Sequence, residues 1–570
     1  MRRARGWSLA GVALVALGVA GLGCGPSDRP IRALLRARVD PARRGTDALQ
    51  PLVARFYRER AFRPGWTSVI GARREAFELE VALDRAAQDG LTRNPADARR
   101  IKELLGMLRP SIFGPVPESR PLAELDVLLT RSYFAAAAQV LGGRVRARDL
   151  PIDWRTGPRS VDLVRALEES LHERKVSASL RRLDPLHPDY VALHAALERY
   201  RATARGGGWR SVRPGASLGP GRESARVADL RARLAAEDDL GPPPADSMRF
   251  DEGLRRAVLR FQRRYGLDTT GVVNAADIEA LDVPASARVR QIELNLERWR
   301  WVPDSLGERY LIVNIPEFML RVVEHDRTVT AMRVVVGKRS WPTPVFSAQV
   351  RYIVFNPLWN VPAKIAANEV LGEIQKDPEY LTRNNIRVYE GTERNAAEVD
   401  AASIRWGMLS PEDLPYTFRQ DPGPANPVGH VKFMCPNPFN VYLHDTPSTQ
   451  YFRRIERAFS HGCVRVEKPL VLAEYVLGAR PEWDRKGIAA AIDTSSNQAV
   501  TVPAPLPVHF FYFTAWVNDQ GEVEFRRDIY GIDDLHDRAL RGEPLPTRAD
   551  LDQARDQISR VRAISNSSDR

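Results

Sequence analysis

The N-terminal part of the chain carries the hydrophobic spacing of amphipathic helices. Between residues 46 and 205 apolar side chains recur three and four positions apart, as at Leu122, Leu125 and Leu129. This spacing places them on one face of a helix. Residues 206–220 are rich in arginine and glycine, a composition typical of linkers. We therefore predict a helical scaffold domain over 46–205, followed by a linker.

A second, compact helical unit is predicted over residues 221–285. Its apolar stripe has helical spacing and consists of Leu254, Ala257, Val258 and Phe261. Gly266 provides a stop after this helix, and Asn274 is a good N-cap for the next one. A connecting helix over 286–304 then leads to the rest of the chain.

From residue 305 the period of the pattern changes to that of strands. Runs rich in β-branched residues occupy 310–315 and 332–337, and such runs are typical of sheets. The expected fold class is therefore a multidomain α+β protein. It has an N-terminal helical scaffold, a small helical domain, and a mainly β domain over 305–540.

Two segments of the mainly β domain depart from this pattern. Strand periodicity is lost over 363–428, where we predict a helix near 365–375 and polar loops. Near the end, apolar runs flank the turn-forming residues that begin at Asn518, so a hairpin over 507–526 is expected to close the sheet. The final residues, 541–570, are polar and are predicted to be loosely held.

Candidate chemistry is concentrated in the segment Ser460–Val466. Cys463 precedes Arg465 by two positions, and His444 lies upstream at the end of a predicted strand. Only the thiolate of cysteine is a good nucleophile. Because a free thiol has a pKa of about 8.5, it needs a base or a positive field to react at neutral pH. His444 is the candidate base. The segment thus has the residues of a thiol nucleophile with its activating groups.

Neighbouring residues complete this candidate site. Gly462 lets the backbone turn closely past a substrate carbonyl, and its amide and that of Cys463 are candidate oxyanion donors. Arg465 is expected on the same strand face as Cys463, where a guanidinium either lowers the thiol pKa or binds a carboxylate. An ordinary ion pair is the alternative for Arg465. His461 either orients the loop, contacts substrate, or has a structural role.

This segment resembles the catalytic motif of the L,D-transpeptidases, the YkuD-like cysteine enzymes that cross-link peptidoglycan. That motif is a histidine, an intervening loop, and then Ser or Thr before His-Gly-Cys. Here residues 445–459 separate His444 from Ser460, a spacing that fits. The strings at 356–362 and 431–434 resemble the large, multidomain, YcbB-like branch of the family.

The resemblance implies a peptidoglycan L,D-transpeptidase. The Cys463 thiolate would attack the L,D-peptide bond of a donor stem tetrapeptide, form a thioester, and pass the acyl group to an acceptor amine, making 3-3 cross-links. Tyr442 and Ser460 are assigned to substrate binding. The resemblance also implies trapping of the thiol by carbapenem-type β-lactams, and neither a cofactor nor a metal is expected.

The other domains carry weaker resemblances. Strings at 56–60 and 125–130 resemble the scaffold domain of the same branch, which implies a supporting role or contacts with envelope proteins. The string 257–271 resembles the small three-helix peptidoglycan-binding domain, which implies contact with stem peptides and glycan; a helical spacer is the alternative. The insertion at 363–428 is expected to cap the active site and exclude water.

Two other function classes stay open. A hydrolase with the same residues would pass the thioester to water, as an L,D-carboxypeptidase or endopeptidase does. A non-catalytic wall-binding protein would keep the small helical domain alone, but intact Cys463 and His444 speak against it.

Cys435 has three interpretations. It fills a core position as a small apolar residue, or it forms a disulfide with Cys463. A third possibility joins it with His444, His461 and Cys463 in a zinc site. The zinc interpretation fits the ligand types but not the usual spacings, so we favour the core position.

The N-terminus predicts export. Residues 1–23 combine three arginines with an apolar stretch too short to span a membrane comfortably, as in signal peptides. Cys24 resembles a lipidation site, which implies a lipid anchor in the outer membrane facing the periplasm; ordinary cleavage near Gly23 or a retained anchor are the alternatives. Residues 24–45 are expected to be a linker.

The net charge adds little to these predictions. The chain has a formal charge of +12, but it contains no nucleotide- or nucleic-acid-binding motif, so we expect no nucleic-acid partner. A positive charge suits an anionic envelope polymer.

Overall fold

The computed structural model describes residues 27–39, 48–88, 90–110, 115–157, 159–237, 248–391, 396–478, 480–555 and 557. It has two compact units, one of residues 1–139 and 161–183 and one of residues 140–160 and 184–570. The expected signal peptide and the lipidation site Cys24 lie outside the described residues. No helix of the described chain is long and apolar enough to cross a membrane.

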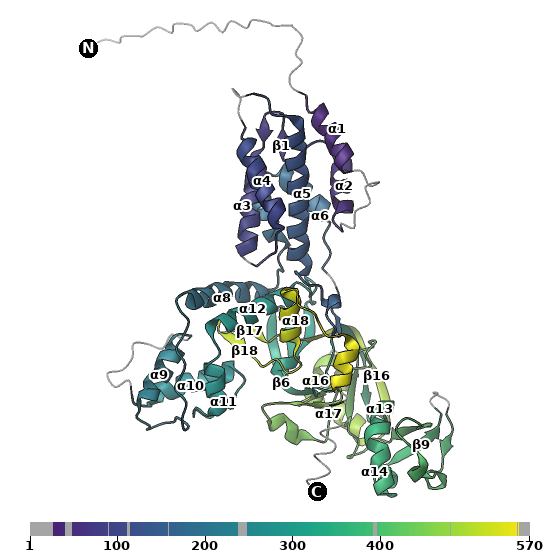
Figure 1. Ribbon diagram of the computed structural model, residues 1–570. Helices are drawn as coiled ribbons and strands as arrows, with labels where there is room; N and C mark the ends of the chain where they lie inside the picture. Colours follow the sequence, from purple (N-terminus) through teal and green to yellow (C-terminus); the bar gives the residue numbers. More distant parts are fainter. Residues whose placement is uncertain are drawn as a thin grey trace, which may run out of the picture. The chain divides into compact units, whose positions relative to one another are not determined.

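The first unit is helical, as predicted. Its helices are α1 (Arg29–Arg38), α2 (Gln50–Glu59), α3 (Arg74–Gln88), α4 (Pro95–Met107), α5 (Ser119–Gly142), α6 (Leu163–His172) and α7 (Val176–Ser179). A short hairpin, β1 (Thr67–Ser68) and β2 (Gly71–Ala72), follows α2. Helices α3, α4 and α5 run side by side (Figure 1). The predicted stripe of α5 is buried at Leu122, Leu125 and Leu129, which confirms its helical register.

A buried carboxylate organises the core of this unit. Asp126 is fully buried on α5, and it accepts hydrogen bonds from the backbone of Gly65, Trp66 and Thr67 and from the hydroxyl of Tyr57. Because an unpaired buried carboxylate is costly, these donors fix the 65–67 segment against α5. The network is saturated, and we assign it a structural role.

The second unit is built on a ten-stranded sheet. Its strands are β3 (Trp154–Arg155), β4 (Arg309–Asn314), β5 (Met319–Glu324), β6 (Arg327–Gly337), β7 (Val345–Phe355), β12 (Val431–Met434), β13 (Leu443–His444), β14 (Ala458–Ser460), β15 (Val464–Val466) and β16 (Gln498–Phe511). Strand β12 pairs with both β13 and β7, so the sheet closes into a barrel. The mainly β domain and the α+β class are therefore confirmed.

The second unit also contains the helices that surround this barrel and the helices of the small helical domain. They are α8 (Pro188–Arg205), α9 (Ala225–Ala235), α10 (Glu252–Arg264), α11 (Ala275–Leu281), α12 (Ala285–Trp299), α16 (Pro469–Leu477), α17 (Arg485–Asp493) and α18 (Ile532–Leu540). Helix α8, which the sequence grouped with the N-terminal scaffold, belongs to the second compact unit. Asn274 caps α11 in a reciprocal capping box with Asp277, as its position predicts.

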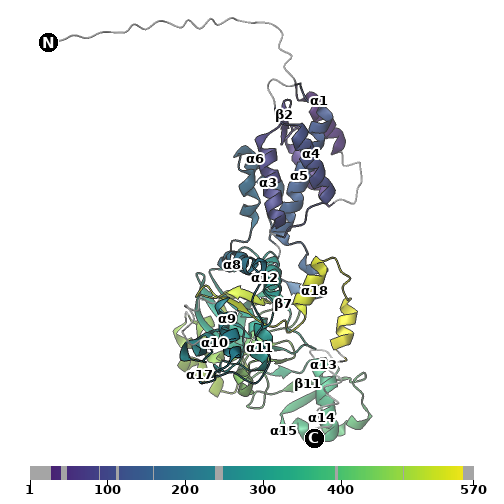
Figure 2. The same ribbon diagram turned by 60° about the vertical axis from the view of Figure 1, so that its left-hand side comes forward.

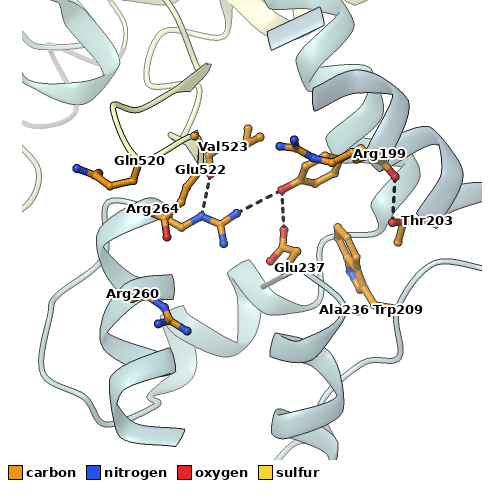
Figure 3. Close-up of a pocket in the computed structure, with 12 residues that line it drawn as sticks. Arg199, Thr203, Trp209, Ala236, Glu237, Arg260, Arg264, Gln520, Glu522 and Val523 are labelled. Atoms are coloured by element: carbon orange, nitrogen blue, oxygen red, sulfur yellow. Dashed lines mark hydrogen bonds between the residues drawn. The ribbon is translucent and has the colours of Figure 1, made fainter. Parts of the chain in front are cut away.

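The small helical domain is anchored to the rest of the second unit through Arg264 at the end of α10. Its guanidinium donates to the carbonyl of Val523 (2.9 Å) and to the hydroxyl of Tyr200 (3.4 Å), as Figure 3 shows. In return Arg526 donates to the carbonyl of Arg264 (2.7 Å). Gly266, with φ +63°, lies against Arg526 so closely that a Cβ would clash. These contacts fix the position of α10 beside the barrel.

The insertion at 363–428 corrects the sequence expectation of polar loops. It contains α13 (Ala363–Ile365), the π-helix η4 (Ala366–Val370), α14 (Leu371–Lys376) and α15 (Tyr380–Arg383). Its strands β9 (Ile386–Glu390), β10 (Glu398–Val399) and β11 (Tyr416–Gln420) form a four-stranded sheet with β8 (Trp359–Asn360), which precedes the insertion. The helix near 365–375 is confirmed. The insertion has its own apolar core, around Ile374, Val388 and Phe418. Figure 2 shows it as a separate lobe of the second unit.

The expected hairpin over 507–526 is divided. Residues up to Phe511 belong to β16, and only β17 (Ala515–Val517) pairs with β18 (Val523–Phe525). The strand ends because side chains take over its backbone partners: the amide of Phe513 donates to Asn314 and that of Thr514 donates to Asn295. In the predicted tail, Arg548 is ion-paired with Asp153.

Candidate active site

The register of three neighbouring strands defines the face that carries the candidate site. Lys432 of β12 lies opposite His444 of β13, and His444 lies opposite Arg465 of β15. Partners that lie opposite one another across a sheet project to the same side. The three charged or titratable side chains therefore share one face of the barrel wall.

Alternation adds two residues to this face. Tyr442 precedes His444 by two positions, and Cys463 precedes Arg465 by two, so both project to the same side as their neighbours. The amide of Val464 donates to the carbonyl of Tyr442 (3.1 Å), which keeps Tyr442 and Cys463 side by side. The rings of Tyr442 and His444 lie 5.5 Å apart. Cys463 and Arg465 thus share a face, as the sequence predicts, and the register of β13 and β15 adds Tyr442 and His444 to that face.

Cys435 lies on the other face. It belongs to the alternate set of Phe433, Val441 and Leu443, all of which are buried in the main core, and its exposed fraction is 1%. Its thiol donates to the carbonyl of Val441 (3.5 Å). The two thiols are free and point to opposite sides of the sheet, which favours the core interpretation of Cys435 over the disulfide and zinc alternatives.

The loop before Cys463 is held by its own hydrogen bonds. Gly462 has φ +108°, a conformation that favours glycine. Its amide donates to the Ser460 hydroxyl (3.2 Å), Ser460 donates to the carbonyl of Cys463, and Thr343 donates to the carbonyl of Gly462 (2.8 Å). Ser460 is buried and braces the loop, although the sequence suggested contact with substrate. The Gly462 amide is likewise engaged, so the Cys463 amide is the better oxyanion candidate.

The Cys463 thiol is half-buried, and it donates a hydrogen bond to the carbonyl of Asn440 (3.8 Å). Burial raises its pKa above the ordinary value, while hydrogen bonds from Tyr442 and the charges of Lys432 and Arg465 oppose that rise. The cations are therefore placed as the sequence suggested for Arg465, but burial outweighs them in this state. The resting group is the thiol.

His444 is oriented by the backbone. Its Nδ1 lies 2.6 Å from the carbonyl oxygen of Asp445. A carbonyl only accepts, so Nδ1 carries the proton and Nε2 carries the lone pair in the neutral ring. Burial, together with the charge of Arg465, lowers the pKa of His444 to about 3. Among the described residues no hydrogen bond joins His444 to the Cys463 thiol. The imidazole is thus neutral and able to accept a proton.

Arg465 is a cation without a counter-ion. Within the described part of the chain it forms no ion pair, and its Nε is buried without a hydrogen-bond partner. Its guanidinium carbon lies 6.0 Å from the centroid of the Tyr451 ring. Burial lowers its pKa from the usual value. The ordinary ion-pair interpretation of Arg465 is therefore not supported by any carboxylate nearby.

His461 points to the insertion. Its Nε2 lies 2.6 Å from a carboxylate oxygen of Glu369 in the π-helix η4 and 3.0 Å from Nζ of Lys338. The edge of its ring packs against Trp341, with centroids 5.0 Å apart. This contact joins the loop of Cys463 to the insertion. Of the roles considered from sequence, orientation of the loop fits best.

Two residues of this neighbourhood were not singled out from sequence. Nζ of Lys432 lies 3.8 Å from the centroid of the Tyr442 ring, and burial lowers its pKa. A lysine inside a four-residue apolar strand was the available signal. Glu369 left no signal, because its contact with His461 depends on the π-helix. In the described residues no group of three or more His, Cys, Asp or Glu side chains could hold a metal.

A closed β-barrel presents a thiol, a neutral histidine and an unpaired arginine on one face of its wall, and these are residue types that cysteine-dependent acyl transfer requires. Residues 308–497 match the family described as "L,D-transpeptidase catalytic domain". Residues 51–197 match "Scaffold domain", and residues 223–281 match "Putative peptidoglycan binding domain". The chain thus carries an L,D-transpeptidase catalytic domain of the YkuD family together with these two domains.

One curated relative and several solved structures are similar to parts of this chain. A protein of Haemophilus influenzae named "Putative L,D-transpeptidase" is 33% identical over 244 residues, which is 43% of this chain and 48% of that protein. The chain thus spans about half the length of this curated relative. Solved L,D-transpeptidase structures from Xylanimonas cellulosilytica (15% identity, TM-score 0.17, 52% of this chain and 99% of that one) and Mycobacterium smegmatis (13%, 0.17, 36% and 58%) are also similar.

Proposed function

We propose that this protein is a peptidoglycan L,D-transpeptidase with Cys463 as its nucleophile. The observation that carries the proposal is the shared face of Cys463, Tyr442, His444, Arg465 and Lys432 within a domain that matches the L,D-transpeptidase family. The substrate would be a stem tetrapeptide of the wall. The first product would be its terminal D-amino acid, and the second a 3-3 cross-link.

In the first step the thiol proton passes to Nε2 of His444 as sulfur attacks the carbonyl carbon of the L,D-peptide bond. The Cys463 amide is free among the described residues and would donate to the developing oxyanion, a contribution of about 3 kcal/mol in other acyl transfers. The imidazolium then gives its proton to the leaving amine as the C–N bond breaks. A thioester remains. An acceptor amine attacks it, and the thiol is restored.

Arg465 and Lys432 are proposed to receive a carboxylate of the stem peptide. Arg465 has no counter-ion among the described residues, and a planar guanidinium suits a carboxylate. Burial lowers the pKa of His444 most, and the charges of Arg465 and Lys432 lower it further. A bound carboxylate would offset them, and His444 would become a stronger base only when substrate is present.

The insertion is proposed to cover the site during the second step. Its contact with the Cys463 loop, through Glu369 and His461, supports a cap that excludes water while the thioester awaits an amine. This contact favours transfer over hydrolysis to a carboxypeptidase product.

We further propose that the protein acts in the periplasm, anchored by a lipid at Cys24, and that carbapenem-type β-lactams acylate Cys463. The peptidoglycan-binding domain at 223–281 supports contact with the wall. The scaffold domain at 51–197 is proposed to contact envelope proteins.

The test is turnover of disaccharide-tetrapeptide by the purified protein, followed by mass analysis of the products. Wild-type protein should yield cross-linked dimers, and Cys463→Ala should yield neither dimers nor a thioester. His444→Ala should keep the thiol but label slowly with iodoacetamide near neutral pH, because the base is missing.

Cys435→Ala is the matched control, since it removes a thiol from the opposite face of the same sheet. It should retain cross-linking. Dimer formation by Cys463→Ala would refute the proposed nucleophile, and tripeptide as the sole wild-type product would favour the hydrolase.

A further inference from the structure

A cleft separate from the thiol lies between the small helical domain and the barrel. Its volume is about 840 Å³, enough for a short peptide. One wall is the end of α10 with the following turn, from Arg263 to Asp277. The other walls are Pro316–Met319, the loop Arg453–Arg457 ahead of β14, and the residues that follow β18. Neither Cys463 nor His444 lines it.

Arginines dominate the lining of this cleft. They are Arg263, Arg333, Arg453, Arg454, Arg457, Arg526 and Arg527. Three are ion-paired: Arg333 with Glu467, Arg526 with Glu524 (2.8 Å) and Arg527 with Glu279 (3.3 Å). Over the described ranges of the chain, the other four have no carboxylate partner. The cleft therefore holds an excess of positive charge that the protein itself does not balance.

Arg457 shows this imbalance most clearly, because it is only 9% exposed. Its guanidinium donates to the carbonyls of Phe318 (3.1 Å), Val334 (3.3 Å) and Arg454 (2.6 Å). Burial, with the charge of Arg333, lowers its pKa to about 10. The hydrogen-bond partners of Arg457 are carbonyls, and the charges of Glu467 and Glu317 offset its burial only in part. An anion in the cleft would therefore be favourable.

Some of the acidic side chains that line the cleft are already paired and others are not, and this difference narrows the class of ligand. Asp277 is occupied by the capping box of α11, and Glu317 is ion-paired with Arg321. Asp268 and Glu456 line the cleft without an ion pair among the described residues. A ligand that carries carboxylates for the arginines and an amine for these two acids matches the lining better than a polyphosphate does.

We propose that this cleft binds a second stem peptide of the wall polymer, through its carboxylates and the side-chain amine of its diaminopimelate-type residue. The inference rests on the proposed function for the identity of the polymer. The loop Arg453–Arg457 leads directly into β14 and the Cys463 loop. A peptide bound here would thus hold a neighbouring part of the wall beside the reacting thiol and raise its effective concentration.

The experiment is photo-crosslinking of a stem tetrapeptide that carries a diazirine, with the full chain bearing Cys463→Ala. Adducts are mapped by mass spectrometry, and those on residues 263–269 report the cleft because this wall is distant in sequence from the motif. The double variant Arg453→Glu/Arg454→Glu should reduce these adducts at least tenfold while leaving adducts near His444. Arg263→Glu tests the opposite wall. Arg327→Glu/Arg351→Glu, which makes the same charge change on exposed strand positions, should retain both sets.

Loss of cleft adducts in both reversal variants, and with a peptide whose carboxylates are amidated, would support the proposal. Equal labelling by the amidated peptide, or no adducts on 263–269, would overturn it. The proposal would also be overturned, in favour of a phosphate polymer, if inorganic phosphate displaced the stem peptide from the cleft and chloride at equal ionic strength did not. Adducts in the cleft without adducts near His444 would instead count against the proposed function and leave the cleft intact.

Discussion

Lys432 offers the sharpest test of how the site activates its thiol. Nζ lies 3.8 Å from the centroid of the Tyr442 ring, and Tyr442 lies one strand spacing, about 4.8 Å, from Cys463. The charge of Lys432 lowers the pKa of the Cys463 thiol. For a charge about 6 Å from a sulfur, Coulomb's law gives about 3 kcal/mol at an effective dielectric constant of 20 and about 0.7 kcal/mol in bulk water. A half-buried lysine belongs between these limits.

Lys432→Met should therefore lower the thiolate population of Cys463 by roughly tenfold, since 1.4 kcal/mol corresponds to a factor of ten. The assay is the rate of iodoacetamide alkylation of Cys463 near neutral pH, where the rate follows the thiolate fraction. Lys432→Arg should keep most of the wild-type rate.

Lys486→Met removes the same charge from an exposed position of α17 and should leave the rate unchanged. If Lys432→Met alkylates as fast as wild type, the cation does not act on the thiol. If Lys486→Met slows alkylation equally, the effect belongs to the net charge and not to the register of β12.

Two further outcomes are expected. Deleting residues 363–428 should shift products from cross-linked dimers toward hydrolysed tripeptides while Cys463 stays alkylatable, because the insertion has its own core; an unchanged ratio would mean that it does not gate the acceptor step. Burial lowers the pKa of His509 to about 4. Below pH of about 6.5 the unfolded chain therefore binds a proton that the folded chain does not. The free energy of unfolding should fall through this group by up to about 1.4 kcal/mol per pH unit, down to about pH 4. Urea unfolding between these limits measures that slope, and His509→Gln should reduce it.

The sequence predicts best where one segment carries the whole signal. Asn274 caps α11 as its residue type predicts, and the stripe of α10 is buried as its spacing requires. Cys463 and Arg465 share a face because they are two positions apart on one strand. Such local relations need no knowledge of which strands pair.

Contacts between segments that are distant in the chain could not be predicted from the sequence. Lys432 joins the site only because β12 pairs with β13 in the register that sets it opposite His444, and a slip of one residue would send it into the core. In the insertion, β9 buries Ile386 and Val388 but exposes Arg387, so half of each strand is polar and the segment resembled loops. The hairpin was overextended because Asn314 and Asn295, which end β16, are distant in sequence.

The charges around Cys463 create a conflict that the free protein does not resolve. Lys432 and Arg465 favour a thiolate, but they disfavour the imidazolium that must form when His444 takes the thiol proton. Both cations lack a carboxylate partner in the described chain, so the thiol and the neutral imidazole remain the stable pair. Under the proposed function, a stem peptide would bring the missing anion, and its carboxylate would offset the cations beside His444 while the buried site excludes water. Under the proposed function, activation would then accompany substrate binding, and Cys463 would stay mainly in its thiol form until a donor peptide is bound.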